Sequence, residues 1–283
     1  MLTKADSSDF KGRFREIVAD PLNLLIRRHP QAGMISGDHV TLHNGNLVFA
    51  RGPQAYYQDF SDILVINRGV HEPLEELVFQ EMLTALPPAP VMLELGAYWA
   101  HYSMWLKRAR PQAALHMVEP DPANGDVGRA NLALNGFDGT YREAFVGHGA
   151  FAVDDWFDEI GLARLNVLHC DIQGYEIEML QGATRALADR KVDYWFISTH
   201  SQNLHVQAEQ GLRDAGYRVE VSADFTHQTT SFDGFMLGVH PGLPPVLPGP
   251  APLGRTEIAT ADPRTLIESL AGRLGAGRPS HVI

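Results

Sequence analysis

Polar residues stand at the ends of several short apolar runs in this sequence, where buried strands are expected to end. Glu94 and Gly96 close one such run, and Glu119 closes the next. Asp171 follows a third run, and His200 follows a fourth. The carboxyl ends of parallel strands meet at one edge of a sheet, where ligands bind, so we expect these side chains to share a site. Carboxylates and an imidazole gathered there would bind cations and hydroxyl groups and would transfer protons.

The turn that contains Gly96 is poor in glycine for a nucleotide-binding turn. A dinucleotide presses its pyrophosphate against further glycines, but Tyr98 and Ala100 stand there and no Lys or Arg is near. S-adenosylmethionine has no phosphate and carries a positive sulfonium. Glu94 suits its cationic amino-acid portion, and Glu119, about 20 residues beyond the turn, suits the ribose hydroxyls. The turn therefore favours S-adenosylmethionine over NAD.

Methyl transfer to a hydroxyl group needs an acceptor held in line with the methyl carbon and a group that takes the hydroxyl proton. We expect His200 to be that base, with Asp171 orienting it or replacing it. Asp171 could also ligate a metal ion, but the segment after His200 offers no second acid, so no metal is expected.

From Val91 onward the sequence alternates between strand and helix patterns, which predicts a parallel sheet that would position these residues. The predicted strands are 91–95, 114–119, 140–146, 165–170, 193–199, 217–222 and 234–239, and the predicted helices are 100–109, 122–135, 175–189 and 204–215. The last two strands leave no room for a helix between them, which predicts an antiparallel pair. Before Val91 we expect two short helices within residues 8–29, a hairpin at Asn44-Gly45, a strand at 62–67 and a helix at 71–86. A helix at 262–273 follows a proline-rich linker.

The composition restricts the function. Of the 283 residues, 45% are hydrophobic and 20% charged, which is typical of a globular protein. The excess of 34 acidic over 23 basic residues gives a net charge of −11, which disfavours nucleic acid as a partner; Arg13 and its basic neighbours are interpreted as a solvated helix face. No apolar run predicts a membrane span, and no secretory signal is recognisable. The single cysteine, Cys170, favours a cytoplasmic location.

Five segments in order resemble the FkbM family of S-adenosylmethionine-dependent methyltransferases. They are "VHEP" (70–73), "LELGAYWAHYS" (93–103), "VEPDPANGDVGRANLALNG" (118–136), "LHCDIQGYEIEMLQGA" (168–183) and "STH" (198–200) before "LRDAGY". The chain departs from the family at Glu94, Tyr98, Ala100 and Gln173, where Asp, Asn, Gly and Glu are usual. Tyr98 is interpreted as a wall of the cofactor site.

The resemblance implies a Rossmann-like class I methyltransferase with a seven-stranded, mostly parallel sheet, one antiparallel strand and helices on both faces. The implied domains are an N-terminal extension of helices and a β-hairpin (1–87), the cofactor-binding domain (88–241), and a linker with a C-terminal helix (242–283). Transfer to a hydroxyl of a sugar, glycan or polyketide-type natural product is implied. The catalytic candidates are His200, Asp171 and Glu72; the cofactor-binding candidates are Glu94, Gly96, Ala97, Tyr98, Ser103, Glu119, Pro120, Glu143 and Asp171.

Two other interpretations stay open at this point. One is an NAD-dependent oxidoreductase, and the other is a non-catalytic partner protein that keeps the S-adenosylmethionine fold. The N-terminal helices and the last helix could form a substrate lid or a contact in a homo-oligomer, or could cover the sheet.

Overall fold

A mixed seven-stranded sheet forms the centre of the protein, with the strand order β6-β5-β4-β7-β8-β10-β9. The computed structural model describes residues 10–57, 61–147, 149–227, 233–247 and 252–275. The strands are β4 (Val91–Leu95), β5 (Ala114–Val118), β6 (Thr140–Arg142), β7 (Leu165–Cys170), β8 (Val192–Thr199), β9 (Arg218–Ala223) and β10 (Gly234–Val239). β10 runs antiparallel to both of its neighbours, and the other pairs are parallel. The predicted Rossmann-like sheet of seven mostly parallel strands, with one antiparallel strand, is confirmed.

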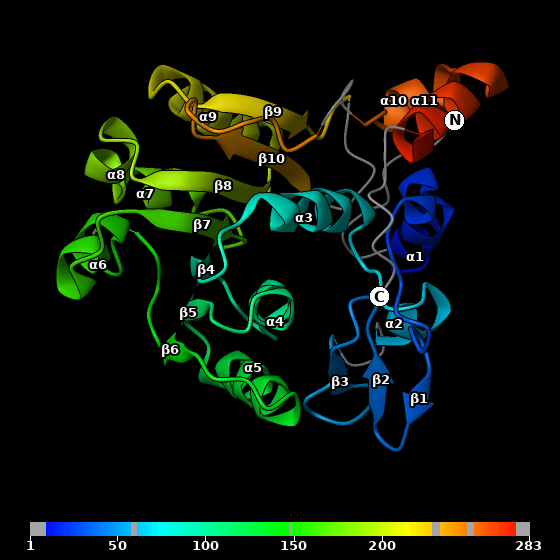
Figure 1. The fold of residues 1–283 in the computed structure, drawn as a ribbon, viewed down its shortest axis with the longest axis horizontal. Coiled ribbons are helices and arrows are strands. Elements are labelled where there is room, and N and C mark those ends of the chain that lie inside the picture. Colours follow the sequence, from blue (N-terminus) through cyan, green and yellow to red (C-terminus); the bar gives the residue numbers. More distant parts are fainter. Residues whose placement is uncertain (1–9, 58–60, 148, 228–232, 248–251, 276–283) are drawn as a thin grey trace.

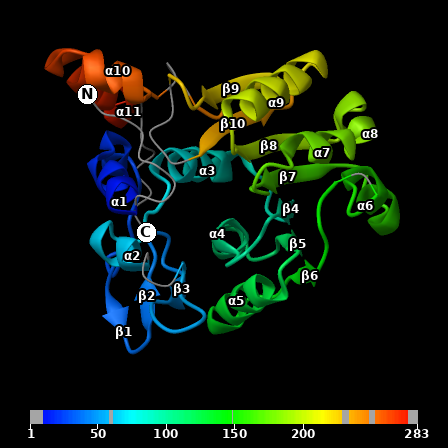
Figure 2. The same ribbon diagram turned by 180° about the vertical axis from the view of Figure 1, so that it is seen from behind.

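Helices cover both faces of this sheet (Figures 1 and 2). One face carries α3 (Pro73–Ala85), α4 (His101–Ala109) and α5 (Pro122–Leu134); the other carries α6 (Val153–Ile160), α7 (Glu176–Gln181), α8 (Thr184–Ala188) and α9 (Gln202–Asp214). β8 shows how one strand serves two cores, because Tyr194 and Phe196 pack into the first layer while Trp195 and Ile197 pack into the second. A strand buried on both faces contains a continuous apolar run, here Tyr194–Ile197, which is why the sequence revealed it.

The N-terminal part adds a small antiparallel sheet beside the first helical layer. It contains α1 (Phe10–Ala19), a short 3₁₀ helix (Pro21–Leu24), β1 (Ile35–Ser36), β2 (His39–Thr41), β3 (Leu47–Phe49) and α2 (Asp62–Ile66). β2 and β3 pair antiparallel around a turn in which Gly45 has a φ of 86°, so the predicted hairpin is confirmed. The second predicted helix is the 3₁₀ helix, which Asp20 caps by accepting a hydrogen bond from the Leu22 N–H at 2.8 Å.

The predicted strand at 62–67 is wrong, because the structure forms the helix α2 there. Ile63 and Leu64 are fully buried, whereas Ile66 is 60% exposed. A strand would have placed positions 62, 64 and 66 on the same face, so this burial follows a helical turn instead. A short apolar run does not distinguish the two structures by periodicity alone.

Other boundaries differ from the prediction in ways that have local causes. The predicted helix at 175–189 is two helices, because the chain breaks at Gly182 and Ala183 between α7 and α8. α6 was not predicted, although Val153, Trp156 and Phe157 bury one face of it. α11 (Pro263–Gly275) agrees with the predicted C-terminal helix, and α10 (Arg255–Thr260) precedes it unpredicted.

The two ends of the described chain lie together. α10 packs beside α1 in both ribbon views, and Arg255 forms an ion pair with Glu16 at 2.5 Å (Figures 1 and 2). α3, which the sequence assigned to the N-terminal extension, covers the central sheet, where Phe79 lies edge-on to Phe196 with ring centroids 5.6 Å apart. Among the described residues, none of the helices has the length and apolar character that a membrane span requires.

Candidate functional site

A cavity of about 400 Å³ opens at the edge where β4, β7 and β8 end. Glu94, Gly96, Asp171 and His200 all line it, so the structure brings these predicted residues together. The remaining lining residues are Arg13, Tyr56, Tyr57, His71, Glu72, Ala97, Tyr98, Trp99, His101, Tyr102, His169, Gln173, Phe225 and Asp233.

A smaller cavity of about 210 Å³ adjoins the first at the ends of β4 and β5. Tyr98, Glu119 and Pro120 line it, together with Ile172 and Tyr175. Gly96, Tyr98 and Asp171 line both spaces, so one elongated ligand could occupy the two together.

The turn after β4 needs glycine at one position for a steric reason. Gly96 has a φ of 75°, and a Cβ atom there would stand 1.8 Å from the Asp171 carbonyl oxygen. Glycine therefore allows the ends of β4 and β7 to approach. Tyr98 (φ 35°) and Ala100 (φ 61°) also have left-handed backbone conformations. The two departures from the family pattern thus change the side chains while the positive φ values that Asn and Gly favour are kept.

Glu119 holds this turn from the end of β5. Its carboxylate accepts hydrogen bonds from the backbone N–H groups of Tyr98 (3.0 Å) and Asp121 (3.1 Å). The Asn124 side-chain amide donates a third hydrogen bond, to Oε1 at 3.3 Å. Because each carboxylate oxygen can accept two hydrogen bonds, Glu119 keeps capacity for one hydroxyl group in the smaller cavity, which it lines.

Glu94 is a buried acid at the wall of the larger cavity. Burial raises the pKa of its carboxyl to about 8, although the Ser103 N–H donates a hydrogen bond to Oε2 at 3.1 Å. Ser103 itself is fully buried, lines neither cavity and contacts the Glu94 carboxylate through this hydrogen bond. Ala97 lines the larger cavity, whereas Glu143, beyond β6, is exposed and lines neither cavity.

His200 lies between two carboxylates. Its Nδ1 is 2.5 Å from Glu176 Oε1, and its Nε2 is 3.1 Å from Asp171 Oδ1. Burial opposes protonation, but these two acids outweigh it and raise the pKa of His200 to about 11, while His200 lowers the pKa of Asp171 against the effect of burial. An imidazole that faces an acceptor at both nitrogens carries a hydrogen on each. His200 in this state is a cation with no lone pair to accept a proton.

Asp233 is a site residue that the sequence reasoning missed. It precedes β10 and lines the larger cavity, with Oδ1 3.9 Å from His200 Nε2. Burial, and then the charge of Asp171, raise its pKa to about 7. The sequence held one signal for it: a strand that runs antiparallel begins at the edge where the parallel strands end, so an acid just before residue 234 should reach the site.

The N-terminal part also contributes to the cavity. Arg13 on α1 lines it with Tyr56 and Tyr57, so the interpretation of Arg13 as part of a solvated helix face is wrong. The structure places Glu72 at the start of α3, where its Oε2 accepts a hydrogen bond from the Tyr102 hydroxyl at 3.2 Å and lies 3.3 Å from His71 Nε2.

Comparisons with known proteins bear on this geometry. Residues 149–219 match the family model described as the methyltransferase FkbM domain. The FkbM resemblance is confirmed. The matched segment includes Asp171, Glu176 and His200, whereas the Gly96 turn and Glu119 lie outside it. A comparison with curated proteins finds no match.

Several solved methyltransferase structures are similar to this chain. A precorrin-6y C5,15-methyltransferase from Geobacter metallireducens is 19% identical, with 58% of this chain and 87% of that chain covered at a TM-score of 0.43. A ribosomal protein L11 methylase from Lactobacillus delbrueckii subsp. bulgaricus is 12% identical, with 61% of this chain and 80% of that chain covered at a TM-score of 0.43. A methyltransferase FkbM from Methylobacillus flagellatus is 19% identical, covering 54% and 44% at a TM-score of 0.42.

Proposed function

We propose that the protein is an S-adenosylmethionine-dependent O-methyltransferase that acts on a hydroxyl group of a small molecule. The observation that carries the proposal is the turn after β4, which has acids on both sides and no lysine or arginine among the described residues that line the smaller cavity beside it. Glu94 and Glu119 are the acids that flank it. A pyrophosphate would lack a cation there, whereas a sulfonium would gain a nearby carboxylate.

The residues present fit this cofactor. Glu119 would accept a hydrogen bond from a ribose hydroxyl, and Pro120 and Ile172 offer apolar contact for the adenine. Glu94 would face the positive charge of the methionine portion from the larger cavity. When bound, S-adenosylmethionine supplies a methyl group that is already activated toward nucleophiles.

The proton of the acceptor hydroxyl needs a base other than His200, because both nitrogens of that ring face carboxylates. Asp233 is the residue we assign to this role. Its pKa of about 7 leaves much of it ionised at neutral pH, and it lines the cavity. Asp171 is the alternative base, but its contact with the His200 cation lowers its pKa and makes it the weaker acceptor. His200 thus positions Asp171 and places a positive charge beside the site where an alkoxide would develop.

The lining of the larger cavity supports a sugar or a polyketide-type acceptor. Tyr56, Tyr57 and Trp99 provide flat apolar faces, while Glu72 and Asp233 provide hydrogen-bond acceptors for hydroxyl groups. A binding site made of aromatic walls with a few polar groups is typical for a small organic ligand.

Calorimetry with S-adenosylmethionine, S-adenosylhomocysteine and NAD tests the proposal against its alternatives. We expect both adenosyl ligands to bind and NAD not to bind. Binding of NAD alone would favour an oxidoreductase, and binding of none would favour a non-catalytic partner protein. Incubation with labelled cofactor and extracts of the native host would then identify the acceptor through the labelled product. Resistance of the label to mild base would distinguish a methyl ether from a methyl ester.

A further inference from the structure

Three buried side chains from different parts of the chain meet beside the larger cavity. They are His43, just after β2, Glu76 in α3, and His101 at the start of α4, and we name them the His–Glu cluster. One potential ligand atom from each residue lies within 4.8 Å of the other two. The residues are 1%, 0% and 2% exposed, respectively.

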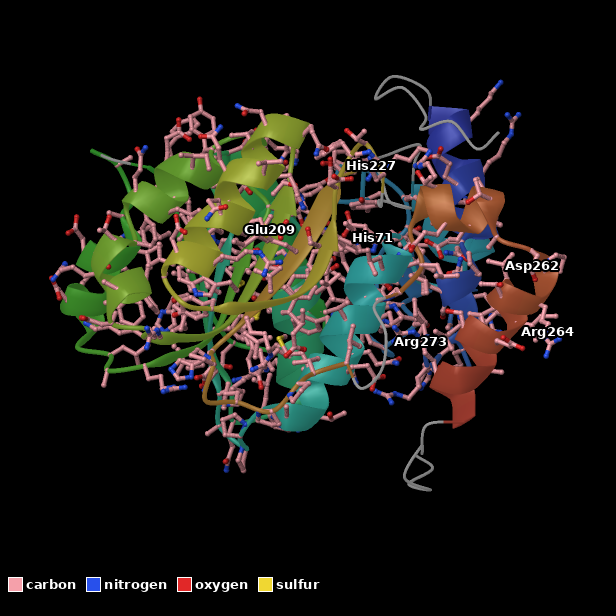
Figure 3. The ribbon with its side chains drawn as sticks, turned by 90° about the horizontal axis from the view of Figure 1, so that it is seen from above. His71, Glu209, His227, Asp262, Arg264 and Arg273 are labelled. Atoms are coloured by element: carbon pink, nitrogen blue, oxygen red, sulfur yellow. The ribbon has the colours of Figure 1, made fainter. Side chains whose placement is uncertain are left out.

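The surroundings hold the carboxylate and one ring in fixed orientations. Glu76 Oε1 accepts hydrogen bonds from the backbone N–H groups of His71 (2.8 Å) and Glu72 (3.1 Å). His71, labelled in Figure 3, also places its Nδ1 2.6 Å from this oxygen. His43 Nδ1 lies 2.9 Å from the Gly69 carbonyl oxygen, which can only accept, so this nitrogen carries the hydrogen. A ring nitrogen that donates to a backbone carbonyl while the other stays free is the usual arrangement of a metal-binding histidine.

Several nitrogen and oxygen atoms of the cluster have no hydrogen-bond partner among the described residues. They are His43 Nε2, Glu76 Oε2 and both ring nitrogens of His101, although Glu76 Oε2 lies 3.0 Å from His43 Nδ1 as an ion-pair contact. His101 is enclosed by aromatic rings, with Trp99 stacked at 4.9 Å and His71 edge-on at 4.7 Å. Buried polar atoms nearly always have hydrogen-bond partners, so this concentration of buried polar atoms without one indicates a ligand site.

We propose that His43, Glu76 and His101 bind a divalent transition-metal ion of the zinc type. Two imidazole nitrogens and one carboxylate oxygen form a donor set that suits zinc, with a further position for water. The hard cations magnesium and calcium prefer sets made of oxygen alone, which this cluster does not offer. Because the three ligands come from the hairpin region, α3 and α4, the ion would join the N-terminal part to the helices that cover the sheet.

The test uses full-length protein from which any polyhistidine tag has been removed. The metal content is measured by elemental mass spectrometry, and the protein is then stripped with a chelator and titrated with zinc, or with cobalt followed by visible absorption. We expect one equivalent to bind and the melting temperature to rise with zinc, since a ligand that binds only the folded state stabilises it. The variant His101→Ala should bind zinc at least tenfold more weakly. The matched control His227→Ala removes an exposed histidine and should bind as the wild type does.

The proposal is overturned if stripped wild type shows no saturable binding of zinc or cobalt at one equivalent. It is equally overturned if His101→Ala and His227→Ala bind zinc alike, because the cluster would then be a metal-free hydrogen-bonded core. Should His101→Ala fail to fold, His43→Gln provides a second ligand variant, and the wild-type titration decides in any case. Cofactor calorimetry on the same samples keeps this result separate from the methyltransferase proposal.

Discussion

The buried acid Glu94 makes a quantitative prediction about cofactor binding. With a pKa of about 8, its carboxyl is about nine-tenths protonated at pH 7 in the free protein. A cationic cofactor prefers the ionised form, so binding should expel this proton. The ionised fraction rises from about 0.01 at pH 6 to about 0.5 at pH 8, and the apparent Kd is the intrinsic Kd divided by that fraction. The affinity for S-adenosylmethionine should therefore increase about fiftyfold across this range.

Calorimetry at pH 6, 7 and 8, in buffers with different ionisation enthalpies, measures both the affinity and the protons released. At pH 7 we expect release of about 0.9 proton per site. The amino group of the ligand titrates in the same range, so the decisive quantity is the difference between wild type and Glu94→Gln. The variant should lose the increase in affinity between pH 6 and pH 8, because its amide cannot ionise.

Glu143→Gln is the matched control, since Glu143 is exposed and lines neither cavity. It should keep the wild-type pH dependence. Identical pH dependence of wild type and Glu94→Gln would refute the assignment of Glu94 to the positive charge of the cofactor.

Three further predictions concern the base, the ribose contact and the turn. Because Asp233 must be ionised to accept a proton, kcat/KM should rise with pH through about 7, and Asp233→Asn should remove that limb and lower kcat by about 10²–10⁴; an unchanged limb would reject Asp233 as the base. Glu119→Ala should weaken S-adenosylmethionine binding at least tenfold (about 1.4 kcal/mol) with kcat at saturation largely kept, and unaltered binding in calorimetry would contradict the ribose role. Gly136→Ala should lower the free energy of unfolding in urea by about 1–2 kcal/mol, from backbone strain alone, because nothing lies within 4 Å of the added Cβ. Gly96→Ala should lower it by well over that amount, because its Cβ would also stand 1.8 Å from the Asp171 carbonyl oxygen. Equal losses would refute the close approach.

The sequence predicted the central sheet well because its strands are buried on both faces. Val192–Thr199 is buried at all of its positions, and the continuous apolar run Tyr194–Ile197 within it predicts a buried strand that ends close to His200. The strand predicted at 62–67 was wrong because a short apolar run is equally compatible with a buried helix.

The chemistry of the site was harder to predict, because it depends on distances between residues far apart in the chain. The protonation of His200 follows from the convergence of Asp171 and Glu176 on opposite nitrogens of one ring. Arg13 reaches the cavity from an N-terminal helix whose sequence is typical of a solvated surface. Neither contact leaves a periodic signal in the sequence.

The antiparallel strand β10 explains why this sheet can place so many acids at one edge. Parallel strands present only their carboxyl ends there, which supply Glu94, Asp171 and His200. β10 runs the opposite way between β8 and β9, with Gly234 opposite Thr199, so its first residues reach the same edge. Asp233, directly before β10, thereby lies with Oδ1 3.9 Å from His200 Nε2. If the proton acceptor is Asp233, the antiparallel strand is part of the catalytic design, because an additional parallel strand at that place would carry its start to the opposite edge of the sheet.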